Sequence, residues 1–485
     1  MKFILKISAS TVNSEKSHQW PQFLAAFSAT FLSVGSGFQN GWPSPSVPKL
    51  LSGDLGFEVA PEEVSYVVMI APLGFLIGSP ITGFLLDKIG RKYTLLLLSI
   101  PEILPCILIA TCNNVTILYI ARLIMGIADG ALFTSLPVYM GEISEPKVRG
   151  IIGASHCYGM LVGVLLINIY GSYVPIRTAA CISVFVPLLF LITFVWMPES
   201  PYYLVMKNRL EDARSSLKRL RRMTNVEDEL TKITADVQRQ VSEPSTLRDI
   251  FTIRSNLRGF LIILGLRTLQ QFSGAVALTY YIQIIFKQAD GSLSPVESSI
   301  ICSGLKVLVV SGSSIVVDSF GRKPLLFFSC FGSAVLLITM GVYFVFQQRG
   351  YDLSSFMWFP IICMVLYNVV GAMGLSMIPN LMAAELLSAS IKSKALGILN
   401  MYLGVCIAAV SKLFQWLDHD FGMHVPFFFF GVWCVVGIIF VYFGVPETKG
   451  KTLEEIQQML KGNTNLKLDK MNDNFSNGDV IIDRF

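Results

Sequence analysis

Two short charged stretches of nearly the same composition decide the organisation of this chain: Asp87-Lys88-Ile89-Gly90-Arg91-Lys92 and Asp318-Ser319-Phe320-Gly321-Arg322-Lys323. Each stretch lies between two long apolar runs. Each stretch has an acid at the end of one helix, a glycine that lets the chain turn and two cations at the start of the next helix. This pattern is typical of a hairpin at a membrane surface. Each stretch therefore predicts two membrane-spanning helices joined on one side of the bilayer.

Two further pairs of motifs recur in the same order and at a similar offset along the chain. Glu142 and Arg149 are matched by Glu385 and Lys392 at the same spacing, and Pro198-Glu199-Ser200 is matched by Pro446-Glu447-Thr448. Motifs repeated in order at a similar offset indicate two related halves, which is typical of membrane transporters.

The composition places the chain in a bilayer. It is 53% hydrophobic and 15% charged, whereas an ordinary soluble domain has about 25% charged residues. Twelve apolar runs approach the roughly 20 residues that a helix needs to cross a membrane. They lie at about 20–40, 64–86, 93–112, 115–140, 151–172, 178–197, 257–286, 297–317, 324–346, 356–384, 395–417 and 425–445. The sequence therefore predicts an all-α integral membrane protein with twelve transmembrane helices in two pseudo-repeated six-helix bundles.

These spans divide the chain into five parts. The parts are an N-terminal tail (1–19), an N-terminal six-helix bundle (20–198), a helical linker (199–256), a C-terminal six-helix bundle (257–445) and a C-terminal tail (446–485). Within the linker, 209–222 and 227–240 predict two amphipathic helices that are exposed to solvent. The polar tail beyond Leu460 predicts disorder.

The distribution of cations predicts the orientation. If both termini are cytosolic, most of the 38 Lys and Arg residues lie on the cytosolic side, as the positive-inside rule requires. The net charge of +5 then reflects topology rather than nucleic-acid binding. We expect a multi-pass protein of the plasma membrane whose surroundings are the lipid bilayer. The sequence does not indicate an oligomeric state.

Nothing in the sequence predicts enzyme chemistry, a cofactor or a metal site. The nine cysteines have no CxxC spacing and are interpreted as small buried hydrophobic residues. His419 and His424 are spaced so that they do not share one helical face. Phosphate-binding, metalloprotease and serine-hydrolase motifs are lacking.

Polar residues in the middle of the seventh span predict a binding site for a small polar solute. Gln270 and Gln271 precede Ser273-Gly274, and Tyr280 and Tyr281 follow. Amides both donate and accept hydrogen bonds, as sugar hydroxyls do, and glycine lets a helix break where it lines a cavity. The alternative is that these groups only join helices to one another.

Charged residues within spans need a partner or a water-filled cavity. Arg122 and Asp129 lie on one face of the fourth span, and Glu102 lies in the third. Lys306 lies in the middle of the eighth span, too far from either end to reach water easily. Two interpretations of Lys306 stay open: a structural ion pair, with Asp129 as the favoured acid, or recognition of an anionic or strongly hydrogen-bonding solute.

Taken together, these motifs resemble the sugar porter family of the major facilitator superfamily over nearly all of residues 20–460. The resemblance is carried by the doubled Asp-x-x-Gly-Arg-Lys, Pro137-x-Tyr139-x-x-Glu142-Ile143…Arg149-Gly150, Pro198-Glu199-Ser200-Pro201, Gln270-Gln271-x-Ser273-Gly274 and Pro446-Glu447-Thr448-Lys449-Gly450. Phe286-Lys287 and Ser393-Lys394-Ala395 are similar to the facilitated trehalose transporters of insects.

The resemblance implies two rocking bundles and two groups of functional residues. The cytosolic ion-pair gate would comprise Asp87, Arg91, Glu142, Arg149, Glu199, Asp318, Arg322, Glu385, Lys392 and Glu447. The substrate site would comprise Gln270, Gln271, Lys306, Asn380, Tyr280 and Tyr281. Several positions depart from the family pattern, namely Cys157, Tyr202, Val276, Lys306, Asn380 and Leu403, so most of the family's hydroxyl-binding amides are missing.

We therefore expect a facilitative transporter, a uniporter, of a sugar such as trehalose or a hexose. Proton-coupled members carry an Asp in the first span, where this chain has Gln39, and an amide does not exchange protons near neutral pH. Two alternatives stay open: a proton-coupled sugar symporter, and a non-transporting nutrient receptor on the same fold. The missing amides favour the receptor, whereas the gate motifs in both halves and the short C-terminal tail disfavour it.

Overall fold

The computed structural model describes residues 18–242, 246–388, 391–451 and 453–461. Over these residues the chain is helical and contains no strand. The first half contains α1 (Trp20–Gly41), α2 (Pro43–Leu51), α3 (Pro61–Leu73), α4 (Phe75–Ile89), α5 (Arg91–Thr111), α6 (Val115–Ile143), α7 (Arg149–Tyr173), α8 (Ile176–Ser183) and α9 (Phe185–Phe194). The connecting segment contains α10 (Pro201–Met206), α11 (Leu210–Arg221), α12 (Glu227–Ser242) and α13 (Arg248–Thr252).

The second half has a matching set of long helices. It contains α14 (Arg254–Phe272), α15 (Ala275–Tyr280), α16 (Ile282–Ala289), α17 (Pro295–Phe320), α18 (Arg322–Gln348), α19 (Phe359–Met373), α20 (Ile378–Leu386), α21 (Lys392–Phe421) and α22 (His424–Gly444). A short helix that the sequence did not predict, α23 (Leu453–Lys461), follows. The tail beyond Lys461, which the sequence predicts to be disordered, lies outside the described residues.

Eleven helical stretches of the described chain are long and apolar enough to cross a membrane, and they coincide with eleven of the twelve predicted spans. The twelfth, α1, is more polar, and its Gln22, Ser28 and Ser36 side chains are buried. They are buried because α1 packs against α7 and α9. At Gly37 the contact is so close that a Cβ atom would come within 2.2 Å of the Met160 carbonyl oxygen. The predicted all-α, twelve-span fold is confirmed.

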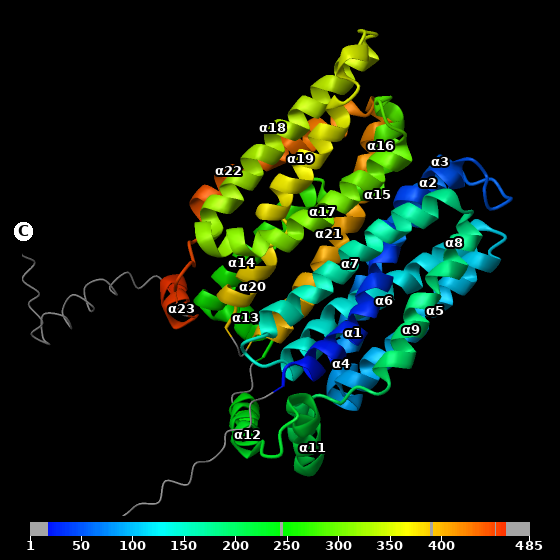
Figure 1. Cartoon of the computed structure of the whole chain (residues 1–485). Coiled ribbons are helices and arrows are strands. Elements are labelled where there is room, and N and C mark those ends of the chain that lie inside the picture. The colour runs from blue at the N-terminus through cyan, green and yellow to red at the C-terminus, as the bar shows by residue number, and fades with distance from the viewer. Residues whose placement is uncertain (1–17, 243–245, 389–390, 452, 462–485) are drawn as a thin grey trace, which may run out of the picture.

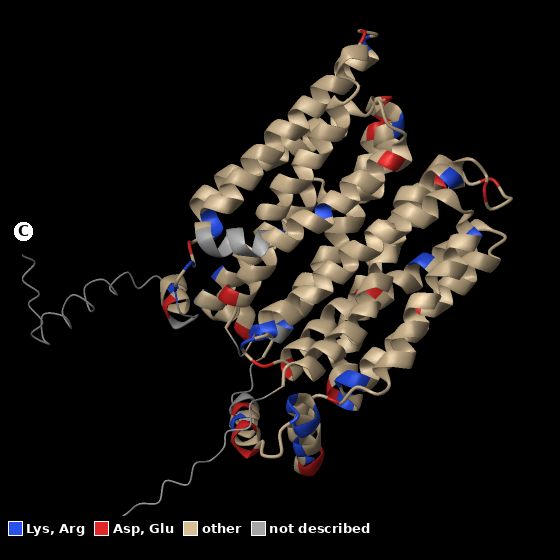
Figure 2. Ribbon diagram, in the orientation of Figure 1, with Lys and Arg blue, Asp and Glu red and all other residues tan. Residues whose placement is uncertain are grey.

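The helices form two bundles, α1–α9 and α14–α22, and the helices α11 and α12 lie beyond one end of them (Figure 1). We call this the linker end and the opposite one the far end. Charged residues gather on α11, α12 and near the ends of the long helices, whose middle parts are almost free of them (Figure 2). Large apolar side chains are exposed on the flanks, including Phe84, Phe185 and Phe443, as a lipid-facing surface requires.

The linker, which the sequence predicts to be exposed to solvent, is attached to the N-terminal bundle. The helices α11 and α12 lie where the sequence predicts two helices, but Arg221 of α11 is 2% exposed. Its guanidinium lies 3.2 Å from Glu145 of the N-terminal bundle and 2.7 Å from Glu229 of α12, and it donates to the Ile143 carbonyl oxygen. The linker therefore docks on the N-terminal bundle through a buried charged group.

The two bundles are joined at the far end. Among the described residues, the hydrogen bonds between the bundles are Tyr280–Asn40 (3.4 Å), Asn168–Ser303 (3.2 Å), Gln283–Ser172 (2.8 Å), Gln415–Pro61 (2.8 Å) and Lys412–Ser65. All of these residues lie in the half of the bundles that is remote from the linker. The bundles therefore meet tightly at the far end in this conformation.

Candidate functional site

The first charged hairpin forms a compact cluster at the linker end of the N-terminal bundle. The Arg91 guanidinium makes two contacts of 2.9 Å with the Glu142 carboxylate, and the Ser200 hydroxyl donates to the same carboxylate. Glu199 accepts the Arg91 backbone N–H at 3.0 Å, so it caps the start of α5. Gly90 has a φ of 101°, which favours glycine.

The second hairpin repeats this arrangement in the C-terminal bundle. The Arg322 guanidinium lies 3.0 Å from Glu385, and the Thr448 hydroxyl donates to Glu385 at 2.5 Å. Glu447 accepts the Arg322 backbone N–H at 3.1 Å, and Gly321 has a φ of 94°. The two clusters correspond residue by residue, which is direct structural support for the repeated halves.

The remaining predicted gate residues do not connect the two clusters. Asp87 is 71% exposed and lies 3.8 Å from Arg91 of its own hairpin. Arg149 and Lys392 each donate to a backbone carbonyl of their own bundle, at 3.3 and 3.1 Å. The side chain of Asp318 lies outside the described residues. Among the residues described, the predicted gate residues thus form two separate clusters, with no ion pair between the bundles.

The two capping carboxylates differ in their electrostatic surroundings. Burial raises the pKa of Glu199, and the backbone N–H groups that it accepts offset only part of this effect. Burial also acts to raise the pKa of Glu447, but four backbone N–H donors outweigh it, so the pKa is lowered overall. The more exposed cap is therefore the stronger acid.

Two of the predicted substrate-site residues are brought together by a residue that was not predicted as part of the site. Arg267 of α14 donates to the Gln270 amide oxygen at 3.2 Å and to the Asn380 amide oxygen at 2.7 Å. The Gln270 amide nitrogen donates to the Ser376 carbonyl oxygen at 3.1 Å. Both amide oxygens already accept a hydrogen bond from Arg267, which makes them weaker acceptors for sugar hydroxyls than the sequence suggested.

The other predicted substrate-site residues lie apart from this group. The Gln271 amide oxygen is buried without a hydrogen-bond partner. The Tyr281 hydroxyl donates to Gln415 at 3.2 Å, and the Tyr280 hydroxyl makes the long 3.4 Å contact with Asn40 of the other bundle. Lys306 is partly buried in α17, and its side chain forms no hydrogen bond or ion pair with the described residues.

Two charged residues within the N-terminal bundle, Asp129 and Arg122, have local partners. Asp129 accepts from the Asn40 amide at 2.9 Å, so the ion pair with Lys306 that the sequence left open is not formed in this conformation. Arg122 donates to the backbone carbonyls of Val67 and Gln39, and its guanidinium lies 4.9 Å from the centre of the Trp42 ring.

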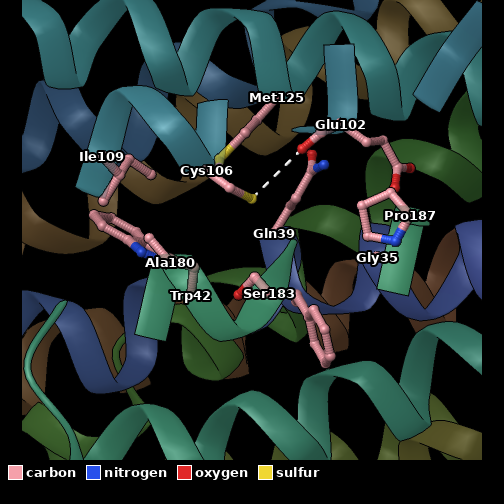
Figure 3. A pocket seen from close by; sticks show the side chains of 11 residues that line it. Gly35, Gln39, Trp42, Glu102, Cys106, Ile109, Met125, Ala180, Ser183 and Pro187 are labelled. Carbon is pink, nitrogen blue, oxygen red and sulfur yellow. Dashed lines mark hydrogen bonds between the residues drawn. The ribbon is translucent and has the colours of Figure 1, made fainter. Parts of the chain in front are cut away.

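Glu102 lies in a small cavity within this bundle, lined also by Gln39, Cys106 and Ser183 (Figure 3). Both of its carboxyl oxygens and the Gln39 amide oxygen lack a hydrogen-bond partner. The water-accessible volume is about 20 Å³, enough for about one water molecule. The cavity is therefore too small for a sugar, but it keeps an unpaired acid inside the bundle.

Arg267 lies within the seventh predicted span, but sequence reasoning did not assign it to the site. Its position was the available signal, because a charge in mid-membrane is a functional hypothesis by default. Its contact with Asn380 joins helices that are 113 positions apart, and one sequence without known contacts does not reveal such a pairing.

Comparisons with known proteins agree with this architecture. The sequence model of the family described as "Sugar (and other) transporter" matches residues 9–460. The facilitated trehalose transporter Tret1 of Bombyx mori is 32% identical over 92% of this chain and 88% of its own length. The Tret1 of Polypedilum vanderplanki is 33% identical over 91% and 88%.

A solved structure shares the fold. The xylose transporter XylE from E. coli, in its inward-open conformation, has a TM-score of 0.75 with 22% sequence identity, over 90% of this chain and 99% of that one. The chain therefore belongs to the Sugar (and other) transporter family, and it is a multi-pass membrane transporter of the major facilitator fold rather than an enzyme.

Proposed function

We propose that the chain is a uniporter that carries a sugar, such as trehalose or a hexose, or a closely related hydroxylated solute, across the plasma membrane by alternating access. The two moving bodies are 20–198 and 257–445, and 199–256 is the cytosolic linker between them. The linker end is then the cytosolic side, with both termini there. The names of the trehalose transporters and of the xylose transporter support a substrate of the sugar class.

The observation that carries this proposal is the asymmetry between the two ends. The hydrogen bonds between the bundles in the described part of the chain lie in the far half, from Tyr280–Asn40 to Gln415–Pro61. At the linker end each charged cluster is complete within its own bundle. This is the pattern expected of one state of an alternating-access cycle, closed on the outer side and separated on the cytosolic side.

In the opposite state, the two clusters would approach each other and close the cytosolic side. Arg91 and Arg322 are already paired within their bundles, so closure adds other groups of the clusters, such as the exposed Asp87 and Arg149 and the half-buried Lys392. Individual exposed ion pairs contribute only about 0.2–1 kcal/mol each. Several together are sufficient to shift a conformational equilibrium whose two states differ by a few kcal/mol.

Uncoupled transport is supported by Gln39, because its amide cannot take up and release a proton near neutral pH. A specific observation favours proton-coupled symport as the second candidate. The N-terminal bundle keeps Glu102 with both carboxyl oxygens unpartnered, and one oxygen of Asp129 is also unpartnered. Buried acids of this kind are typical of proton pathways in membrane transporters.

Uptake of labelled trehalose, glucose, fructose and sugar acids into liposomes that contain the purified protein tests the proposal. We expect uptake that ends at equal concentrations inside and outside and whose initial rate is unchanged when the proton gradient is collapsed. If the solute accumulates above its external concentration, and this accumulation is lost when the proton gradient is collapsed, the protein is a symporter rather than a uniporter. No uptake of any solute would contradict transport of this class.

A further inference from the structure

We propose that Arg267 is the centre of an anion-recognition site, and that the solute bears a carboxylate on a hydroxylated carbon frame, as a sugar acid does. The inference rests on the proposed function, because it names the substrate class for the central site. It starts from one observation: a guanidinium in mid-membrane with only neutral partners.

Arg267 is 7% exposed, and it lies in the part of α14 that belongs to a candidate membrane span. Its hydrogen-bond partners among the described residues are two amide oxygens, and its Nε atom is buried without a hydrogen-bond partner. No carboxylate of the described residues forms an ion pair with it. Arginine stays protonated in proteins, so this positive charge is not compensated within the described part of the chain.

The C-terminal bundle offers no acid at this depth. Its Asp and Glu residues all lie in loops or near the ends of helices: Asp290, Glu297, Asp318, Asp352, Glu385, Asp418 and Asp420. The mid-span charges of this bundle are Arg267 and Lys306, both cations. A single charge at the bilayer centre is energetically unfavourable, which makes an anionic ligand at this place favourable.

The position of Arg267 suits a transported ligand better than a permanent structural anion. The guanidinium donates a hydrogen bond to the side chain of Asn380, which is exposed. The cation therefore lies next to a group that water reaches.

The surrounding groups specify more than charge. A planar guanidinium presents parallel N–H donors that match the two oxygens of a carboxylate. The exposed Asn380 amide beside it can donate to and accept from hydroxyl groups. Lys306 on α17 follows Ser303 by one helical turn, and Ser303 contacts Asn168 of α7. Lys306 is thus on the side of α17 that faces the N-terminal bundle, and it supplies a second positive charge.

The test measures binding of glucuronate, glucose and inorganic phosphate to the purified full-length protein by calorimetry, together with the melting temperature of each variant. The variants are Arg267→Gln, Arg267→Lys and the control Arg254→Gln, which removes an exposed arginine at the start of the same helix. We expect glucuronate to bind at least about 10-fold more tightly than glucose or phosphate, because a charge-assisted hydrogen bond changes affinity by about 10- to 100-fold.

Arg267→Gln should lower the affinity for glucuronate by about 10- to 100-fold relative to the affinity of the same variant for glucose. Arg267→Lys should fall between, and Arg254→Gln should behave as the unaltered protein. Without ligand, Arg267→Gln should melt at the same or a higher temperature, because it removes an uncompensated buried charge. If Arg267→Gln instead melts at a lower temperature and loses affinity for glucose and glucuronate equally, Arg267 has only a structural role in joining α14 to α20. That result would overturn the inference.

Two further outcomes separate this inference from the proposed function. Equal affinity for glucose and glucuronate, with normal glucose uptake, would overturn the anion site and leave the uniporter standing. Tight glucuronate binding without uptake would overturn the uniporter and leave the site standing. Phosphate that binds as tightly as glucuronate would overturn the sugar-acid specificity. If glucuronate is carried, its equilibrium distribution should respond to membrane potential by about 50-fold per 100 mV, whereas that of glucose should not.

Discussion

Replacing Arg91 with methionine tests the charged cluster of the N-terminal bundle, because it keeps much of the length of the side chain and removes its charge. The Arg91 side chain is 7% exposed and that of Glu142 18% exposed. The substitution removes both contacts to Glu142 and the 3.1 Å hydrogen bond to the Leu86 carbonyl oxygen. Glu142 then keeps the Ser200 hydroxyl as its hydrogen-bond partner.

The magnitude follows from this geometry. Removing one partner of a buried ion pair destabilises a protein by about 3–5 kcal/mol. Because Glu142 stays partly exposed and keeps Ser200, we expect the lower end, about 3 kcal/mol. A change of 1 kcal/mol shifts the melting temperature of a domain of about 150–250 residues by about 2–4 °C. The N-terminal bundle is of this size, so we expect a decrease of about 6–12 °C.

The assay is thermal unfolding of the purified protein for Arg91→Met, Glu142→Gln and the double variant. The double variant should recover part of the loss, because it no longer leaves a charge without its partner. Lys88→Met is the matched control: Lys88 is exposed in the same hairpin, and surface substitutions change stability by about 0.5 kcal/mol or less. If Arg91→Met melts like Lys88→Met, or if the two single effects simply add, the cluster does not stabilise this bundle.

Three further predictions concern the same end of the molecule. Gly90→Ala should lower the melting temperature, because a Cβ atom would lie 2.4 Å from a Glu199 carboxyl oxygen, whereas Gly83→Ala, with nothing within 4 Å, should not; equal effects would refute the steric argument. The stability difference between the unaltered protein and Glu447→Gln should shrink as pH falls through the lowered pKa of Glu447. The stability difference between the unaltered protein and Glu199→Gln should instead shift in favour of the unaltered protein as pH falls, because the pKa of Glu199 is raised. Parallel pH profiles of the two variants would contradict this. An epitope at Asn225 should be labelled only after cells are permeabilised, and labelling of intact cells would reverse the orientation.

The sequence alone was sufficient for the architecture, because the bilayer imposes a strong and local signal. Apolar length identifies spans without knowledge of their neighbours, and the doubled hairpin and its capping acids Glu199 and Glu447 repeat in a fixed order. Even α1 was identified, although it is the least apolar of the expected spans. Its polar residues do not face lipid, because they are buried where α1 packs against α7 and α9.

The central site could not be predicted to the same depth, because it depends on contacts between distant helices. The sequence identified Gln270 and Asn380 as polar groups in spans. Only the packing of α14 against α20 shows that Arg267 donates hydrogen bonds to both amide oxygens. The gate shows the same limit. Its residues were predicted as one network, whereas the structure has two clusters, because the conformation decides whether the bundles meet at that end.

Alternating access is the central claim, and a reversible cross-link at the far end tests it most directly. The Asn168 amide nitrogen and the Ser303 hydroxyl oxygen lie 3.2 Å apart on different bundles, so Asn168→Cys and Ser303→Cys together place two thiols within reach of each other. We expect that oxidation forms a disulfide that stops uptake, and that a reducing agent restores it, while each single variant is insensitive to oxidant. Uptake that continues at the full rate with the disulfide formed would contradict the claim, because the far end would then not need to open.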